Sequence, residues 1–222
     1  MRRTAAAEPA LQARASVQRA SHEVRQHQLA EAARKIITGQ GMERLTISAL
    51  AEEMGVSEGA IYRHVRSKQQ ILLLVLDDVE RTWLDAVSRA EEEPARPLEK
   101  LESLFKGHLS RTERRRGVSL LVLNETLRLG DKELRSRAAS IVEDYLGAVG
   151  RLLLECQSAG EVRRDLDVQL AARLFLGMVQ SNVTLWALRS HSYPLSEGWE
   201  ALWDLYCRAI TAGQRPINQE EV

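Results

Sequence analysis

The sequence predicts an all-α fold, in which a small N-terminal three-helix unit precedes a larger six-helix domain. Apolar residues recur at the three-and-four spacing of an amphipathic helix along most of the chain. No segment alternates apolar and polar residues over the length of a strand. Glycine, proline and helix-capping residues separate the periodic segments from one another. These three observations predict nine helices and no sheet.

The boundaries of the expected helices are placed at these glycine, proline and capping residues. The first helix spans 22–39 and ends at Gly39 and Gly41, and short elements follow between Thr46 and Ser67. A long helix starts at Ser67 and ends before Pro94. The remaining helices are expected at 98–111, 117–129, 131–158, 168–190 and 196–212. The small unit then covers 22–66 and the large domain 67–213, between a basic, disordered arm at 1–21 and a polar tail at 214–222.

Composition excludes several classes of protein. The 222 residues carry no net formal charge, but residues 1–68 hold 11 Lys and Arg against 7 Asp and Glu. A basic front is a weak indication of a polyanion-binding end. Cys156 and Cys207 are isolated, so neither a disulfide framework nor a zinc site is expected. The most apolar run, Leu170 to Leu188, contains too many polar residues to span a bilayer, and no signal peptide is visible. A cytoplasmic protein without metal or cofactor is expected.

The most informative segment is LTISALAEEMGVSEGAIYRHVRSK, residues 45–68. Thr46 can cap a helix that turns Ile47, Leu50, Ala51 and Met54 inward. Gly55 ends this helix, and Ser57 caps a second short helix that runs to His64. Two helices that cross steeply on a tight turn need a small residue at their closest approach and a residue that tolerates positive φ. The segment therefore predicts a helix-turn-helix.

The second helix of this motif has a polar outward face that includes Tyr62 and Arg63. Gly59, near its start, allows close approach to DNA. Residues 24–72 as a whole resemble the N-terminal domain of TetR-family regulators, in which a Gly-Val-Ser-x-Gly-x-apolar-Tyr-x-His pattern follows the spaced apolar residues. One departure is Val65, where the family usually has Phe, so a looser junction behind the second helix is expected.

The resemblance implies a role for each matching residue. Thr46 and Ser57 would touch phosphates from the helix N-termini, and Gly59 and Arg63 would lie nearest the bases. The remaining DNA-backbone contacts implied are Tyr62, His64 and Lys68.

Each of these interpretations has an alternative. Residues 55–59 form a literal Gly-x-Ser-x-Gly, the pattern of a hydrolase nucleophile, but that motif requires a preceding strand, so no enzyme is predicted. The helical corner could serve packing alone, although the row of Tyr62, Arg63, His64 and Lys68 favours DNA. The arginines of the N-terminal arm could enter a minor groove instead of remaining disordered.

The large domain holds nearly all the aromatic residues. Family analogy places some of them around an internal ligand cavity, although aromatic residues at helical spacing are also typical of a plain core. The candidate ligand-binding residues are Trp83, Phe105, Asn124, Arg128, Tyr145, Gln180 and Trp186.

The helix expected at 168–190 is apolar on nearly every side, so other helices must cover it on two opposite sides. Its own domain can cover one side and a second copy of the chain the other, while burial within one chain is the alternative. The candidate dimer contacts are Leu174, Met178, Ser181, Leu185, Trp199, Leu202, Trp203 and Tyr206.

Together these features predict a homodimer that binds double-stranded DNA at an inverted repeat, with a small hydrophobic effector of unknown identity releasing it as a repressor. Effector binding would move the long helix that begins at Lys68, and the two reading helices would no longer match their half-sites. Two alternatives stay open. One is a helical ligand-binding or enzymatic domain with the motif as scaffold only, and the other is a DNA-binding organiser without small-molecule input, which an interior filled by side chains would favour.

Overall fold

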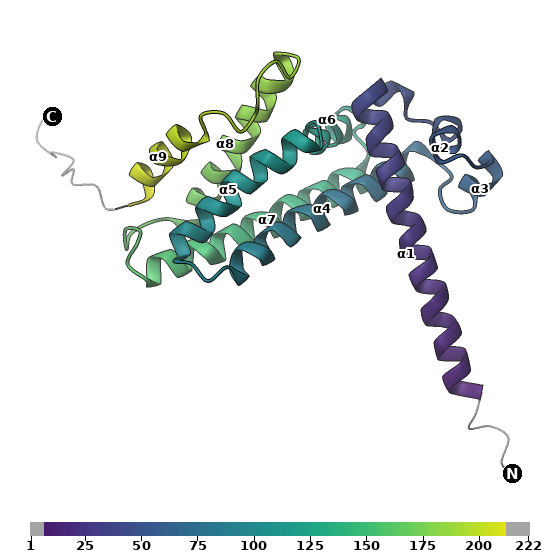
Figure 1. Cartoon of the computed structure of the whole chain (residues 1–222), viewed down its shortest axis with the longest axis horizontal. Coiled ribbons are helices and arrows are strands. Elements are labelled where there is room, and N and C mark those ends of the chain that lie inside the picture. Colours follow the sequence, from purple (N-terminus) through teal and green to yellow (C-terminus); the bar gives the residue numbers. More distant parts are fainter. Residues whose placement is uncertain (1–6, 212–222) are drawn as a thin grey trace, which may run out of the picture.

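The computed structural model describes the backbone of residues 7–211 and the side chains of residues 23–211. Over this part of the chain it contains nine α-helices, one short 3₁₀ helix and no strand, which confirms the all-α prediction. The small unit lies at one end of an elongated bundle, and the two helices nearest the C-terminus lie along one side of it (Figure 1).

The N-terminal unit consists of α1 (Ala7–Gln40), η1 (Met42–Arg44), α2 (Ile47–Met54) and α3 (Glu58–Tyr62). The first helix starts earlier than residue 22, where the sequence predicted it, because α1 already begins at Ala7. This Ala-rich stretch has high intrinsic helix propensity, which needs no apolar face. Among the described side chains of α1, Leu29, Ala33 and Ile36 are buried, and α2 and α4 pack against this helix.

The larger part of the chain consists of α4 (Lys68–Glu92), α5 (Pro97–Arg114), α6 (Val118–Leu129), α7 (Lys132–Ser158), α8 (Val168–Leu188) and α9 (Trp199–Ile210). Helices α4 and α7 lie side by side, and α5 packs on both of them. Helix α8 packs on α7 and α5, and α9 lies at the outer edge against α5 and α8 (Figure 1).

Helix α4 belongs to the cores of both parts. Its first turns bury Ile71, Leu72 and Val75 in the same apolar cluster as Leu29 and Ile36 of α1, and its later turns bury Trp83 among α5 and α7. Ser67 begins α4 as predicted, because its side chain accepts a hydrogen bond from the Gln70 amide at 3.2 Å. A rigid helix that is packed at both ends can carry a displacement from one part to the other.

No helix among the described residues is long and apolar enough to cross a membrane.

Candidate DNA-binding surface and ligand pocket

The predicted helix-turn-helix forms with its caps in place. The Thr46 side chain accepts a hydrogen bond from the Ala49 amide at 3.1 Å, and the Ser57 side chain accepts one from the Ala60 amide at 3.3 Å. Gly55 ends α2 in the left-handed conformation, with φ of 64°. Because each capping hydroxyl uses a lone pair for its own helix, its hydrogen is left to donate to a phosphate oxygen.

The outer face of α3 is open. Ser57, Gly59, Tyr62 and Arg63 are exposed, and Tyr62 keeps 48% of its surface accessible. A Cβ added at Gly59 would meet no atom closer than the Ser57 Oγ at 3.9 Å, so the surface there is flat and open. His64, the residue after Arg63, is half-buried. The arrangement presents hydroxyl, phenol and guanidinium donors on one short helix.

Val65 lies in the core behind α3. It is only 2% exposed and packs in the same core as Ile61 and Leu45. The expectation that valine leaves this junction looser than phenylalanine stays a prediction.

Lys68 does not extend freely from the surface. Its ammonium group lies 3.1 Å from a Glu125 carboxylate oxygen of α6 and donates to the Met42 carbonyl at 3.0 Å. Glu125 is buried and also binds Arg128 at 2.6 Å, and these two bases lower the pKa of Glu125 to about 2. Lys68 thus connects the N-terminal unit to α6 in this structure, and its charge is already paired.

A second polar connection starts at the buried carboxylate of Asp78 on α4. Arg115, at the end of α5, forms an ion pair with Asp78 and donates to the Thr82 hydroxyl at 2.7 Å. Arg81 binds the same carboxylate at 2.6 Å and shares a 2.9 Å hydrogen bond with His27 Nδ1 on α1. These groups, Arg115–Asp78–Arg81–His27, form a continuous chain from α5 to the N-terminal unit, here called the Asp78 network.

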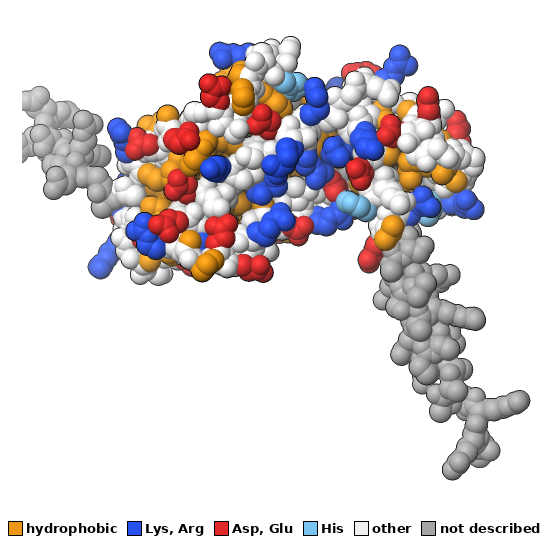
Figure 2. All heavy atoms as spheres, in the orientation of Figure 1, with side chains coloured by type: hydrophobic (Ala, Val, Ile, Leu, Met, Phe, Trp, Pro, Cys, Tyr) orange, Lys and Arg blue, Asp and Glu red, His pale blue; other side chains and the backbone are white. Residues whose placement is uncertain are grey.

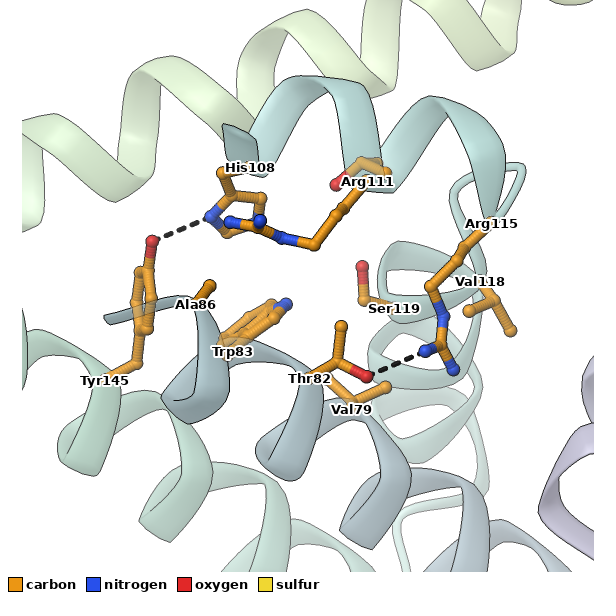
Figure 3. Close-up of a pocket in the computed structure, with 11 residues that line it drawn as sticks. Val79, Thr82, Trp83, Ala86, His108, Arg111, Arg115, Val118, Ser119 and Tyr145 are labelled. Atoms are coloured by element: carbon orange, nitrogen blue, oxygen red, sulfur yellow. Dashed lines mark hydrogen bonds between the residues drawn. The ribbon is translucent and has the colours of Figure 1, made fainter. Parts of the chain in front are cut away.

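Arg115 also lines a small cavity of about 20 Å³ between α4, α5, α6 and α7. Figure 3 shows Trp83, His108 and Tyr145 on one side of this cavity and Thr82, Arg115 and Val118 on the other. A second cavity of about 20 Å³ shares Trp83 and His108 and extends between α6 and α8 as far as Gln180. Each space is about the size that one water molecule needs, so the interior is mostly filled by side chains.

The polar groups of the pocket are neutral at its centre. His108 Nδ1 and the Tyr145 hydroxyl share a buried hydrogen bond of 2.7 Å. Burial, with a smaller contribution from the nearby Arg111, lowers the pKa of His108 to about 3, and burial raises the pKa of Tyr145. Both rings pack against Trp83, with centroid distances of 5.3 Å and 4.9 Å.

The structure brings only part of the predicted ligand set to these cavities. Trp83, Tyr145 and Gln180 line them. Asn124 and Arg128 belong to the predicted set but are exposed, since the face of α6 that carries them points outward. Neither residue lines these two cavities, and a ligand contact by either one stays a prediction.

Two further aromatic residues of the predicted set are core residues and line neither cavity. Phe105 is fully buried, with its ring centroid 5.5 Å from that of Phe175. The Trp186 indole donates to the Tyr193 carbonyl at 2.8 Å. The residues that the sequence prediction missed are on α5 and at its end, where His108 and Thr112 continue the inward row of Leu101, Leu104 and Phe105. Polar residues on an otherwise apolar helix face were the signal available for finding them.

The residues predicted as dimer contacts differ in their exposure. On α8, Leu174 is 45% and Leu185 is 51% exposed, Ser181 is exposed and Met178 is half-buried. On α9, Trp199 and Leu202 are half-buried.

Two of the predicted dimer residues are misassigned. Trp203 is 7% and Tyr206 is 1% exposed, because both rings fill the space between α9 and α8 within one chain. The outward residue of α9 is instead Leu205, at 64% exposure. Leu170 and Leu188 extend the exposed apolar row along α8, which we call the α8–α9 face together with Leu174, Leu185, Leu202 and Leu205.

Other candidate chemistries find no support in the described residues. No group of three or more His, Cys, Asp or Glu side chains is placed to hold a metal ion. Cys156 and Cys207 are free thiols, and burial raises the pKa of Cys156 to about 12 and that of Cys207 to about 11. Ser57 of the Gly-x-Ser-x-Gly pattern caps a helix and follows another helix, so the strand that a nucleophile elbow requires is missing there.

Comparison with known families gives two matches. Residues 29–75 match the family of bacterial regulatory proteins named for TetR, and residues 81–209 match the C-terminal region of YsiA-like proteins within the same group of regulators. The chain is 27% identical over 168 residues to the fatty acid metabolism regulator protein of Bacillus subtilis, covering 76% of this chain and 86% of that protein. It is 26% identical over 173 residues to the nucleoid occlusion factor SlmA of Aliivibrio fischeri, covering 78% and 88%.

Solved structures share the fold. The regulator FadR from Bacillus subtilis, in complex with stearoyl-CoA, superposes with a TM-score of 0.70 at 27% identity, over 82% of this chain and 97% of FadR. The TetR-family regulator PfmR from Thermus thermophilus superposes with a TM-score of 0.67 at 26% identity, over 81% and 97%. Both likenesses extend over the N-terminal unit and the larger part of the chain.

Proposed function

We propose that this chain, which belongs to the TetR family of bacterial transcriptional regulators, acts as a homodimeric repressor that an acyl-CoA-type effector releases from an inverted-repeat operator. The chain is a DNA-binding regulator and not an enzyme. We assign DNA binding to residues 22–66, and effector binding and dimerisation to residues 67–213. A cytoplasmic location follows from the proposed target, since bacterial DNA lies there.

The observation that carries the DNA-binding site is the open face of α3. Arg63 and Tyr62 project from a short helix whose start, at Ser57 and Gly59, is exposed and free of obstruction. An arginine in the major groove can donate two hydrogen bonds to a guanine, while hydroxyl donors at helix N-termini hold phosphates. We therefore propose Arg63 and Gly59 nearest the bases, and Thr46, Ser57, Tyr62 and His64 against the backbone.

For Lys68 we propose a role other than a permanent phosphate contact. Its ammonium group is paired with Glu125, so a phosphate contact would require that pair to open. We propose Lys68 chiefly as a link between the DNA-binding unit and α6, and as a phosphate contact only in the DNA-bound form.

Dimerisation is proposed through the α8–α9 face. Exposed leucines on two adjacent helices leave an apolar surface that a second copy can cover, and a two-fold arrangement buries the same face on both chains. A two-fold protein presents two α3 helices to two half-sites, which is the reason to propose an inverted-repeat operator.

The effector is proposed from the relatives and from the pocket. One relative regulates fatty acid metabolism, and a structural neighbour at 27% identity binds stearoyl-CoA. The cavities of about 20 Å³ are far smaller than the several hundred Å³ of a typical ligand site, so the effector must separate α5 from α4 and α8 on entry. That displacement moves Arg115 and, through the Asp78 network, pulls on α4 and α1.

The proposal is tested in two steps. Selection of bound sequences from a random duplex pool should recover an inverted repeat, and footprinting should show two protected half-sites. Decanoyl-CoA should then lower operator affinity and raise the melting temperature together, because both follow from preferential binding to one conformer. Recovery of no preferred sequence would refute the DNA-binding assignment, whereas an unchanged operator affinity would refute only the effector.

A second candidate function is that of a DNA-binding organiser without small-molecule input. The nearly filled interior favours it, and the chain is also 26% identical to a nucleoid occlusion factor. The two candidates differ in one measurement, since an organiser should bind DNA with the same affinity in the presence and absence of decanoyl-CoA.

A further inference from the structure

Arg111 is a half-buried cation for which no side chain in the described part of the chain supplies an acidic partner. It lies on the inner side of α5 and lines the first cavity, and Figure 3 shows its side chain extending toward His108. None of the ion pairs and side-chain hydrogen bonds found among the described side chains, residues 23–211, includes this guanidinium. The contrast with Arg115 is direct, because that second arginine of the same cavity is paired with Asp78.

The surroundings of Arg111 are unfavourable for a positive charge. Burial first, and then the charge of Arg89, lowers the pKa of Arg111; Tyr145 acts in the opposite direction, and Arg114 lowers the pKa further. His108 and Tyr145, its neighbours in the cavity, are both neutral near pH 7. A partly desolvated charge without a counter-charge is costly, so the site lacks one negative group.

Positively charged side chains also gather on the surface of this side of the molecule. Figure 2 shows Lys and Arg side chains gathered in a band across the middle of this face of the molecule, over the region where α5 approaches α6 and α1. An anion that approaches from solvent is therefore attracted toward the side of the molecule on which α5 lies. The remaining walls of the two cavities are mainly apolar, with Val79, Ala86 and Val118 in one and Leu176 and Val179 in the other.

We propose that Arg111 binds the anionic group of the effector, so that this pocket selects an amphiphile with an apolar chain and one negatively charged headgroup. This inference rests on the proposed function, and it assigns the counter-charge that the cavity lacks to the ligand. The apolar chain lies toward Leu176 and Val179 at the α8 side, and the headgroup lies at α5, next to Arg111.

A carboxylate and a phosphate would both satisfy the guanidinium. Decanoate, decanoyl-CoA and decanol share the same chain and differ in headgroup, so they separate these two sources from a purely apolar contribution. The experiment measures the dissociation constant of each probe by calorimetry for the full-length protein, for Arg111→Gln, and for Arg114→Gln as the matched control. Arg114 is exposed, lies one turn further along α5 and lines neither cavity.

We expect Arg111→Gln to weaken binding of at least one anionic probe about tenfold to hundredfold, as the loss of a charge-assisted hydrogen bond predicts, and to leave decanol unaffected. Arg114→Gln should change each value by less than about threefold, in line with a screened surface charge. Arg111→Lys should recover part of the lost affinity. The anionic probe that loses affinity identifies the headgroup.

Equal losses in the two glutamine variants, an undiminished affinity in Arg111→Gln, or binding of decanol alone would each overturn the proposal. Failure of both anionic probes to bind the unmodified protein would also overturn it. Operator binding by Arg111→Gln, measured in the same preparation, keeps such a result separate from a failure of the DNA-binding assignment.

Discussion

Lys68, the first residue of α4, forms an ion pair of 3.1 Å with Glu125, a buried residue of α6, and also donates to the Met42 carbonyl of the DNA-binding unit. Glu125 also forms an ion pair with Arg128. Together with the Asp78 network, these contacts of Lys68 provide two polar connections between the DNA-binding unit and the rest of the chain. Both connections include residues of α4, and Trp83 of the same helix lines both cavities.

Glu125→Gln should lower the free energy of unfolding by about 1–3 kcal/mol, because it leaves Lys68 and Arg128 without their counter-charge. The pKa of Glu125 is lowered from 4.5 to about 2 in the folded chain, so its contribution is complete above pH 4.5 and is lost as the pH falls toward 2. Urea titrations between these values should therefore show a steeper loss of stability in the unmodified protein than in the variant. Parallel curves would contradict this account.

Arg63→Ala should change which operator sequence is preferred, with a loss of about 1–3 kcal/mol at the affected position. The reason is that Arg63 is exposed on α3 with its guanidinium free to reach a base edge. Arg151→Ala removes the same charge from an exposed position on α7 and serves as control. Repeating the sequence selection with each variant is the measurement, and an unaltered preference in Arg63→Ala would place Arg63 against the phosphates instead.

Leu185→Glu should dissociate the dimer, weakening self-association by at least about hundredfold, because each chain then buries a charge in place of an apolar side chain. Leu154→Glu, on α7, alters a leucine of similar exposure, 48% against 51%, outside the α8–α9 face. Sedimentation at several concentrations should find monomers only for Leu185→Glu. A dimer that persists in this variant would show that another face is used.

Arg81→Gln should uncouple the pocket from DNA. Arg81 is exposed, so its loss costs little folding stability, but it joins Asp78 to His27 of α1. We expect unchanged affinity for decanoyl-CoA and an effect of that ligand on operator affinity that is smaller by about threefold to tenfold, a sizeable part of a typical coupling energy. Arg151→Gln, with the same charge change outside the network, should retain full coupling. If decanoyl-CoA lowers the operator affinity of both variants equally, the Asp78 network does not transmit the effect of the ligand to the DNA-binding unit.

Much of the fold could be predicted because its signals are local. Helical periodicity, the caps at Thr46, Ser57 and Ser67, and the glycine at position 55 depend on neighbours within a few residues, and the structure contains each of them. The helix-turn-helix and its outward residues follow from the same short-range pattern.

The sequence could not predict which side of an apolar helix meets which neighbour. Trp203 and Tyr206 satisfy the pattern of an interface as well as that of a core, and only the packing of α9 on α8 assigns them to the core. Asn124 interrupts an apolar run in the same way as His108 does, yet one is exposed and the other is buried beside Tyr145.

By itself, then, the sequence determined the helices, the DNA-reading motif and the regulator family, since these depend on spacing and residue type along the chain. Tertiary structure alone decided the partners across the fold: Lys68 with Glu125, Asp78 with Arg115, and Arg111 with no carboxylate among the described side chains. The reason is that ion pairs and cavity walls are formed by residues tens of positions apart, and their geometry depends on how whole helices cross.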